Sequence, residues 1–366
     1  MLSIILFTAV GIYLIELIIL RIGIWKADHI PKNLRYEPFV TVMVAARDEE
    51  DFIGDCISSI LNIDYPQNKI EIIIVNDSST DKTPQIVQSF INAGHNLIML
   101  TTAAGNGNLR GKTNAIAQGM KIAKGELVLF TDADCRVPPT WVKETVKYFS
   151  ADTGIVGGFT LLSANNPFEG IQALDWLFLF SLASATSGLK IPLTAIGNNL
   201  AVRMQAYKEV GGYENIPFSV TEDYALVQAI IQRTKYKLQF PIESNCLVHS
   251  SACKNWGQLY RQKKRWGVGG IDMVLRGYLI MFIGWMAKFL LLISFFLLNA
   301  QTAVAAFVLT GIGEMLFLEK ILRRFKVRKY TLFAVPFLLY FLIYVLVIPF
   351  IAFLSRSVVW KKRNLK

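Results

Sequence analysis

The chain has 366 residues, of which 53% are hydrophobic, and its mean hydropathy is +0.40. It is too apolar for an ordinary soluble domain, which indicates one or two domains beside membrane segments. The net charge of +11 has no nucleic-acid-binding motif behind it, so we expect no nucleic-acid partner. Basic residues that flank membrane segments and face anionic lipid account for that charge. The four cysteines have no CxxC spacing, which argues against a zinc site or a disulfide framework.

The first predicted element is an almost unbroken apolar run, Leu2–Leu20, long enough to cross a membrane as a helix. No lysine or arginine precedes Arg21, and no small-residue cleavage site follows. We therefore interpret residues 1–21 as an uncleaved transmembrane anchor, not as a secretory signal. Basic residues continue from Arg21 to Arg35, and the positive-inside rule then predicts that the next domain is cytoplasmic.

Short, bulky apolar runs alternate with helical stretches in the segment that follows, for which we expect domain boundaries at 38–250. This alternation predicts an α/β domain with a mostly parallel, Rossmann-like sheet covered by helices. The strand-like runs are Val40–Ala45, Ile70–Val75, Asn96–Leu100 and Glu126–Leu129. Ligands bind at the carboxyl ends of strands in such sheets, so the residues that follow each run are candidates for a binding site.

Acidic residues follow the first, second and fourth of these runs, and those after the second and fourth are candidate ligands by their chemistry. Asp132 and Asp134 follow the fourth run, and hard carboxylate oxygens suit Mg²⁺ or Mn²⁺ with substrate phosphates as further ligands. An isolated Asp-x-Asp is more often a solvated turn. Asp77 follows the second run, where its carboxylate can accept hydrogen bonds from a base or a ribose. The alternative for Asp77 is a helix cap, a role that we expect to fall on Asp81.

Two further residues have open interpretations. Lys112 lies in the first turn of a predicted helix that begins with Gly111–Ala115, and a donor-site cation and a solvent-facing lysine are equally acceptable interpretations. His249 follows a strand-like run, and we interpret it as a packed strand-end residue in preference to a metal ligand. The apolar segment Pro167–Phe180 is interrupted by acids, so an interfacial helix and a buried core helix remain equal alternatives.

Two motifs lie in the second half of the chain. Glu222 and Asp223 begin a helical run, where the helix dipole alone stabilises acids. Gln262, Arg265 and Trp266 share one helix face by their spacing. Trp266 offers a ring on which a sugar can stack, and Arg265 offers a fork for phosphate. The alternative for this segment is an interfacial membrane anchor.

The remaining apolar blocks predict further membrane segments. We expect an interfacial segment at 251–277, a transmembrane hairpin at 278–318 and a last span at 330–354. The basic residues between the second and third blocks argue for a cytoplasmic loop. The last span then places Lys361 and Arg363 on the far side, against the positive-inside rule. Either the C-terminus is an exception to that rule, or one block does not fully cross.

Taken in order, these motifs resemble the membrane-bound family 2 inverting nucleotide-sugar glycosyltransferases. That group holds the cellulose, chitin and hyaluronan synthases and ceramide glucosyltransferase. The resemblance extends over roughly residues 40–267 and is not specific for one substrate. It implies a GT-A type nucleotide-diphospho-sugar transferase domain joined to transmembrane helices.

The resemblance also implies a role for each motif, with Mg²⁺ or Mn²⁺ as the cofactor. Asp223 is the implied general base, and Glu222 is a supporting acid. Asp134 and Asp132 are the implied metal ligands, and Asp77 is implied to contact the uracil base. The residues implied in binding the donor nucleotide are Ala45, Arg47, Glu49, Asp77, Lys112 and Asp132. The residues implied in binding the acceptor and the diphosphate are Gln262, Arg265, Trp266 and Asn198.

The predicted function is transfer of a sugar with inversion, from a UDP-sugar to a lipid or glycan acceptor at the cytoplasmic membrane face. A processive polysaccharide synthase is the alternative, because the Gln-x-x-Arg-Trp motif is complete. About four spans are too few to enclose a polymer channel without a membrane partner, which favours a lipid acceptor. An inactive nucleotide-binding scaffold is least favoured, because every acid of the motifs is present. We expect a multi-pass protein of a bacterial inner membrane.

Overall fold

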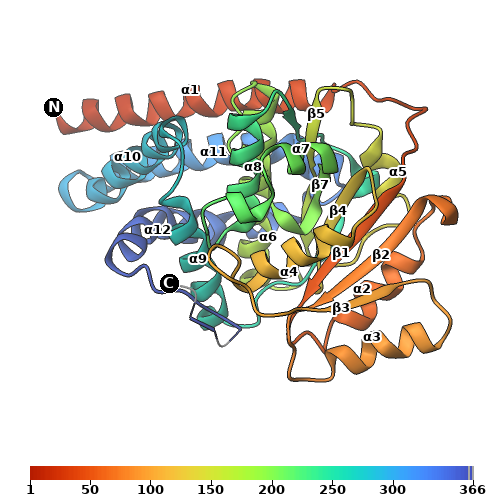
Figure 1. Cartoon of the computed structure of the whole chain (residues 1–366). Coiled ribbons are helices and arrows are strands. Elements are labelled where there is room, and N and C mark those ends of the chain that lie inside the picture. The colour runs from red at the N-terminus through yellow and green to blue at the C-terminus, as the bar shows by residue number, and fades with distance from the viewer. Residues whose placement is uncertain (362, 365–366) are drawn as a thin grey trace. The chain divides into compact units, whose positions relative to one another are not determined.

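The structure is a computed structural model that describes residues 1–361 and 363–364 (Figure 1). The chain divides into two compact units. The helical unit comprises Met1–Lys26, Leu162–Leu193 and Ala252–Arg356. The sheet unit comprises Ala27–Leu161, Thr194–Ser251 and the tail from Ser357 onwards.

The sheet unit is built on seven strands in the order β3-β2-β1-β4-β7-β5-β8 (Figure 1). Four of the neighbouring pairs are parallel, and β7 runs antiparallel to both of its neighbours. The prediction of a mostly parallel sheet is therefore confirmed. The strands are β1 (Val40–Ala46), β2 (Ile70–Asn76), β3 (Ile98–Thr101), β4 (Leu127–Asp132), β5 (Thr153–Gly157), β7 (Leu200–Arg203) and β8 (Lys237–Gln239). A separate two-stranded sheet pairs β6 (Thr160–Leu162) with β9 (Val248–Ser250).

The register of the parallel strands gathers their carboxyl ends at one edge of the sheet. Ala45 of β1 lies opposite Asp132 of β4, and Ala46 lies opposite Asn76 of β2. Because parallel strands end on the same side, the loops that follow β1, β2 and β4 leave the sheet together. The polar residues of these loops therefore start from neighbouring backbone positions.

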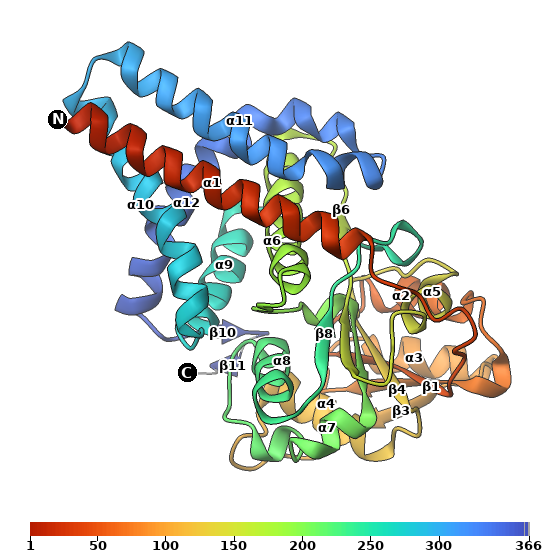
Figure 2. The same cartoon turned by 90° about the horizontal axis from the view of Figure 1, so that it is seen from above.

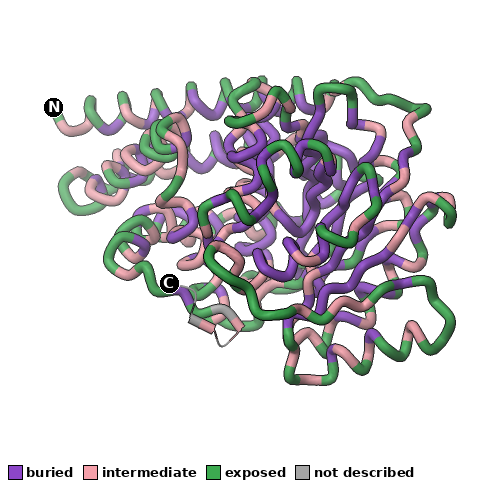
Figure 3. The backbone as a smooth tube through the Cα atoms, in the orientation of Figure 1, coloured by how far each residue is buried: buried purple, intermediate pink, exposed green. Residues whose placement is uncertain are grey.

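Apolar side chains cover both faces of the central strands, which appear as buried segments in Figure 3. Val42, Leu129 and Trp141 are fully buried, and burying an aliphatic side chain such as Val42 or Leu129 contributes about 1.5–3 kcal/mol. The indole nitrogen of Trp141 donates to Asn199 Oδ1 at 2.9 Å, so its polar atom is satisfied. The helices of this unit are α2 (Ile53–Leu61), α3 (Thr83–Asn92), α4 (Gly111–Ile122), α5 (Trp141–Val146), α7 (Met204–Glu209) and α8 (Glu222–Arg233).

Four helices of the described chain are long and apolar enough to cross a membrane. They are α1 (Leu2–Asp28), α10 (Leu275–Leu297), α11 (Ala300–Arg324) and the segment Arg328–Leu354, which contains α12 (Ala334–Leu354). Two further helices, α6 (Pro167–Gly188) and α9 (Trp256–Gly270), complete the helical unit. This composition supports a membrane protein, as the hydropathy predicts.

Helix α6 is buried over most of its length. Asn166 caps it, because the Asn166 side chain accepts a hydrogen bond from the Glu169 backbone nitrogen at 3.0 Å. Within the helical unit α6 packs against α11 and α12. This burial decides between the two interpretations of Pro167–Phe180 in favour of a core helix.

A buried ion pair joins three helices of the helical unit. Lys288 of α10 pairs with Glu314 of α11, and both side chains are 3% exposed or less. Tyr13 of α1 donates to Glu314 Oε1 at 2.9 Å. Figures 1 and 2 both show α1 running beside α11, in agreement with this bond. Charges inside a membrane segment face partners because lipid offers them no solvation.

We predict that Lys288→Met destabilises the protein by roughly 3–5 kcal/mol, because it leaves the buried Glu314 carboxylate without its counter-charge. Pairing Lys288→Met with Glu314→Gln should restore most of that loss. The measurement is the free energy of unfolding in mild detergent, with the exposed Lys329→Met as a control for loss of one positive charge. Equal stabilities of Lys288→Met and Lys329→Met would contradict a structural role for the pair.

Candidate active site

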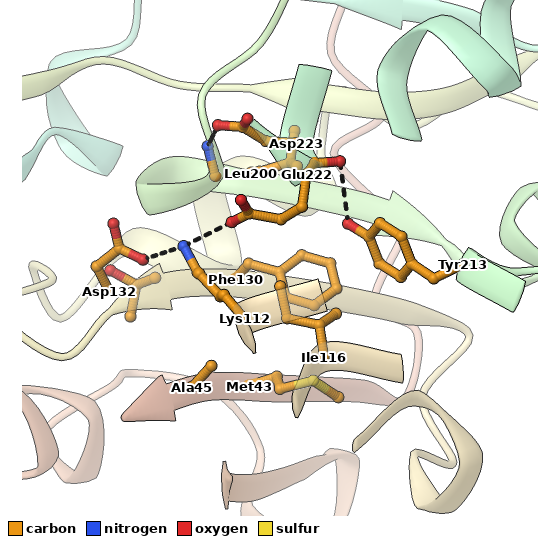
Figure 4. Close-up of a pocket in the computed structure, with 12 residues that line it drawn as sticks. Met43, Ala45, Lys112, Ile116, Phe130, Asp132, Leu200, Tyr213, Glu222 and Asp223 are labelled. Atoms are coloured by element: carbon orange, nitrogen blue, oxygen red, sulfur yellow. Dashed lines mark hydrogen bonds and ion pairs between the residues drawn. The ribbon is translucent and has the colours of Figure 1, made fainter. Parts of the chain in front are cut away.

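A lysine joins two acids that come from different parts of the sheet unit (Figure 4). Lys112 Nζ lies 2.6 Å from Asp132 Oδ1 and 2.9 Å from Glu222 Oε1. Asp132 is the last residue of β4, and Glu222 is the first residue of α8. The Lys112 side chain is only 18% exposed, so it faces this site and not solvent. The structure thus excludes a solvent-facing Lys112, and its role as a donor-site cation remains a prediction.

The charge of Lys112 is fixed by its neighbours. Burial by itself would lower the pKa of Lys112, but the carboxylates of Asp132 and Glu222 outweigh it and hold the pKa well above its usual value. The ammonium group therefore remains protonated throughout the physiological range. It is a permanent positive charge between the end of β4 and the start of α8.

Asp223 lies in the same cavity as this ion-pair network. The cavity is lined by Ala45, Lys112, Asp132, Glu222 and Asp223, among others (Figure 4). Asp223 Oδ2 accepts a hydrogen bond from the Gly197 backbone nitrogen at 2.7 Å, which fixes the carboxylate. Burial, followed by the charge of Glu222, raises the pKa of Asp223 to about 6, although Lys112 acts in the opposite direction. At neutral pH this carboxylate is ionised and more basic than an ordinary aspartate.

A concentration of negative charge surrounds the end of β4. Burial, followed by the charge of Asp132, raises the pKa of Asp134, and the opposing effect of Lys112 is smaller. Burial also raises the pKa of Glu49 to about 7, with smaller contributions from Asp134 and Asp132 that Lys361 opposes. A further positive charge at this place would therefore stabilise the ionised acids.

The donor set fits a hard divalent cation only in part. Within residues 1–361 and 363–364, no group of three or more His, Cys, Asp or Glu side chains is arranged to hold a metal by itself. Asp132 and Asp134 offer oxygen ligands, and their mutual repulsion would be relieved by Mg²⁺ or Mn²⁺. Such an ion would take its remaining ligands from water and from substrate phosphates. The two carboxylates thus fit a metal that arrives with a diphosphate.

The loops after β1 and β2 are tied together at the same edge. Arg47 Nη1 donates to the backbone oxygens of Asp77 at 2.5 Å and Ser78 at 3.2 Å. Asp48 and Ser78 both have positive φ angles, 50° and 52°, which non-glycine residues rarely adopt. The arrangement holds Asp77 in place, but it engages Arg47 with backbone carbonyls and not with an open binding site.

Asp81 and Asp77 take different roles, as the sequence predicted for Asp81. Asp81 Oδ1 accepts from the backbone nitrogen of Thr83, the first residue of α3, at 2.9 Å. Asp77 is buried, and its Oδ1 accepts a hydrogen bond from Thr102 Oγ1 at 3.3 Å. Its ligand role remains a prediction.

The C-terminal tail also reaches this edge of the sheet unit, which sequence reasoning missed. Arg363 Nη1 lies 2.8 Å and 3.1 Å from the two carboxylate oxygens of Asp77. Lys361 Nζ lies 2.8 Å from Glu49 Oε1 and 2.9 Å from the Asp48 backbone oxygen. The only signal in the sequence is that basic residues follow the last apolar block.

Asn198, which the resemblance implies in acceptor binding, is buried in the sheet unit. Asn198 is 2% exposed, and its Oδ1 accepts from Thr160 Oγ1 at 3.0 Å. The next residue, Asn199, donates to the backbone oxygens of Phe159 and Cys246. Asn198 therefore forms a hydrogen bond inside the sheet unit, and its role in acceptor binding remains a prediction.

The Gln-x-x-Arg-Trp residues lie on α9 in the helical unit. The ring of Trp266 lies 5.5 Å from that of Trp176 on α6, measured between centroids. Lys263 pairs with the buried Asp175 and lies 4.2 Å from the centre of the Trp266 ring. Gln262 and Arg265 are partly exposed on the same helix. Sequence reasoning missed the Lys263–Asp175 pair, because nothing in α6 alone indicates a partner.

His249 lies on the short strand β9, with an exposed side chain. Its backbone bridges Arg136: the Arg136 nitrogen donates to the His249 oxygen at 2.8 Å. Among the described residues it joins no metal-binding group. His249 thus lies in a strand as expected, but its side chain is exposed and not packed, which differs from the prediction.

Comparisons with known proteins identify the family of the chain. Residues 41–211 match the sequence model described as glycosyl transferase family 2, and residues 127–355 match glycosyl transferase family group 2. The β-monoglucosyldiacylglycerol synthase of a Synechocystis species is 29% identical, over 74% of this chain and 56% of its own length. The poly-β-1,6-N-acetyl-D-glucosamine synthase of Staphylococcus epidermidis is 26% identical, over 65% of this chain and 56% of its own length. The chain thus spans just over half the length of these relatives.

A solved structure shares the fold. The mannosyltransferase PcManGT from Pyrobaculum calidifontis, in complex with GDP-Man and Mn²⁺, is 19% identical with a TM-score of 0.58. The likeness covers 96% of this chain and 99% of that one. At this identity it supports the fold alone, and it confirms the expected GT-A type. Because the second family match extends over more than half of its residues, the chain belongs to the family 2 glycosyltransferases.

Proposed function

We propose that the chain is a membrane-bound glycosyltransferase that moves a sugar, with inversion, from a nucleotide sugar to a lipid acceptor. The observation that carries the proposal is the cavity in which Lys112, Asp132, Glu222 and Asp223 meet. This cavity lies at the strand edge where a nucleoside diphosphate would bind. It also contains the carboxylate of Asp223, which is held in one orientation and can accept a proton. Family membership supports this reaction class.

The donor would bind along the ends of β1, β2 and β4. In this proposal Asp77 contacts the base, Ala45, Arg47 and Glu49 form the adjoining wall, and the diphosphate lies near Asp132. A UDP-sugar is the first candidate, and a GDP-sugar is the alternative, because the mannosyltransferase of similar fold holds GDP-Man. Mg²⁺ or Mn²⁺ held by Asp134 and Asp132 would neutralise the charge that develops on the leaving nucleoside diphosphate.

Lys112 has two tasks in the proposed reaction. Its permanent charge holds Asp132 and Glu222 at a short separation, which connects the donor edge to the start of α8. It also lowers the negative potential where the diphosphate must enter, since an anion would otherwise meet only carboxylates. Glu222, the supporting acid, acts through Lys112 as a positioning residue.

Asp223 is the proposed general base. The acceptor hydroxyl oxygen attacks the anomeric carbon, its proton passes to Asp223, and the bond from that carbon to the diphosphate oxygen breaks. The leaving diphosphate takes the electron pair, so one displacement inverts the configuration without a covalent intermediate. The hydrogen bond from Gly197 holds Asp223 in one orientation, and its raised pKa suits proton transfer near neutral pH.

The acceptor is proposed from the membrane setting. Four candidate membrane helices and a relative named as a β-monoglucosyldiacylglycerol synthase favour a lipid hydroxyl as the acceptor. The residues proposed to bind the acceptor are Gln262, Arg265, Trp266 and Asn198. The relative named as a polysaccharide synthase keeps processive chain growth as the second candidate. Product mass separates them, because one added sugar indicates a single transfer and a ladder indicates a polymer.

The sheet unit is proposed to face the cytoplasm of a bacterial cell, where nucleotide sugars would be available to it. The basic residues that follow the first apolar run, from Arg21 to Arg35, support this orientation. A cysteine placed at the exposed Asn96 should react with an impermeant reagent from the cytoplasmic side only. Reaction only from the opposite side would overturn the orientation.

We predict that Asp223→Asn lowers kcat by about 10²–10⁴-fold and leaves the dissociation constant of the donor within about twofold. Asparagine preserves the shape and can still accept from Gly197, but it cannot take the proton. The measurement is nucleoside diphosphate release together with calorimetric donor binding. Asp64→Asn is the matched control, because Asp64 is 64% exposed and pairs with Lys143 at the surface. Full turnover by Asp223→Asn would contradict the base assignment.

We also predict that kcat/KM falls below about pH 6, by roughly tenfold per pH unit. The sign follows from the base, because protonation of Asp223 below its raised pKa removes the group that must accept the proton. The residual activity of Asp223→Asn should lack this acidic limb. An identical limb in both proteins would assign the titration to another group.

A further inference from the structure

The C-terminal tail forms a basic hairpin on the acidic edge of the sheet unit. Strand β10 (Val359–Trp360) pairs antiparallel with β11 (Arg363–Asn364), and Lys361 occupies the turn with a φ of 46°. We call the described residues 357–361 and 363–364 the strap. Its two cations each meet one acid, Arg363 with Asp77 and Lys361 with Glu49.

The contact between Arg363 and Asp77 is strong because the carboxylate is buried and because both of its oxygens are engaged. The Asp77 side chain is 4% exposed, so its charge is screened little by water. Arg363 lies against both carboxylate oxygens, and Thr102 approaches Oδ1 from another direction. The strap therefore supplies a positive charge to a buried carboxylate, and a buried charge without such compensation is costly in a protein interior.

We propose that the strap is an internal competitor of the donor nucleotide, which must displace Arg363 from Asp77 before it can bind. The inference rests on the proposed donor role of Asp77. A base or ribose that hydrogen-bonds to Asp77 needs the carboxylate oxygens that Arg363 occupies. The arrangement is autoinhibitory, and the apparent donor affinity is reduced by the fraction of molecules whose strap is in place.

Both cations of the strap hold it to the same edge. Lys361 contacts Glu49 and the backbone of Asp48 in the loop after β1, while Arg363 contacts Asp77 after β2. A nucleotide diphosphate brings its own negative charge to this edge, so it weakens the attraction at Asp77 and offers the arginine a different anion. Displacement is therefore an exchange of ion pairs and needs no unfolding of the sheet unit.

The strap has a consequence for the membrane crossings. Because Arg363 contacts Asp77, the tail lies on the same side of the membrane as the sheet unit. The three candidate membrane helices α10, α11 and α12 lie between the last part of that unit and the tail. A segment whose two ends lie on the same side of the membrane crosses it an even number of times. The three helices α10, α11 and α12 therefore cannot all cross. The charge pattern left two alternatives, an exceptional C-terminus or one apolar block that does not fully cross the membrane. The contact of Arg363 with Asp77 favours the second.

The test compares UDP and GDP binding to the full-length protein and to Arg363→Ala, in detergent with Mg²⁺, by calorimetry. If the strap is in place in most molecules, Arg363→Ala should lower the dissociation constant of the favoured nucleotide about three- to tenfold. The KM for the corresponding nucleotide sugar should fall by a similar factor. Arg363→Lys keeps the positive charge on a different, more flexible side chain, so its dissociation constant should lie between those of the wild type and Arg363→Ala.

Arg356→Ala is the matched control, because it removes one exposed basic residue beside the strap and leaves the contact with Asp77 intact. Unchanged affinity in Arg356→Ala and tighter binding in Arg363→Ala support the inference. Equal or weaker binding in Arg363→Ala overturns it, and weaker binding would make Arg363 a donor ligand. If the folded wild type and Arg363→Ala both bind neither nucleotide, the proposed donor site itself fails.

A second measurement follows the strap with both of its cations kept. Ser357 is exposed, and Cys253 is the one native cysteine of the four that is not buried, so Ser357→Cys is made together with Cys253→Ser. An impermeant maleimide should label this position from the same membrane side as Asn96→Cys. Labelling from the opposite side would separate the tail from Asp77 and overturn the inference.

Discussion

The site depends on one lysine held between two carboxylates. Lys112 contacts Asp132 and Glu222, and without it the acids at the end of β4 and the start of α8 would repel one another. The free energy of that repulsion would oppose the placement of the start of α8 beside the end of β4. With the ammonium in place, a surplus of negative charge remains nearby, at Asp134 and Asp223, where the proposed chemistry needs it. Their raised pKa values follow from burial and from neighbouring acids.

The fold supplies this geometry through the parallel register of the central strands. Ala45 stands opposite Asp132, and Ala46 opposite Asn76, so the loops after three strands leave the same edge. A different element, the short helical turn Gly197–Asn199 before β7, carries the backbone nitrogen that orients Asp223. The candidate catalytic and binding groups therefore lie at strand ends, in the first turns of helices and in loops, whereas the buried strands that position them are almost purely apolar.

Local patterns were enough to predict the first four strands of the sheet and the acids at their ends, but not β5, β7 and β8. The runs before Asp77 and Asp132 are short and mostly apolar, and the acids that follow them lie at strand ends, as expected. What could not be predicted are contacts between residues distant in the sequence. Lys112 meets Glu222 across 110 positions, and Arg363 meets Asp77 across 286, and no periodicity encodes such partners.

Two other features show the same limit. The acids in Pro167–Phe180 suggested a polar helix face, but Asp175 is buried because it pairs with Lys263 on α9. Burial of that pair favours the core helix over the interfacial helix, its equal alternative in the sequence. Similarly, the charge pattern left the side of the C-terminus open, since hydropathy gives the length of a helix and not whether it crosses.

The most direct test is nucleoside diphosphate release by the purified full-length protein in lipid vesicles. UDP- and GDP-sugars are supplied one at a time with Mg²⁺ or Mn²⁺, with and without a bacterial lipid extract. We expect release from one donor that requires both metal and lipid, together with a lipid product heavier by one sugar. A folded protein that binds the nucleotide and releases none under any condition would contradict a glycosyl-transfer function for this site.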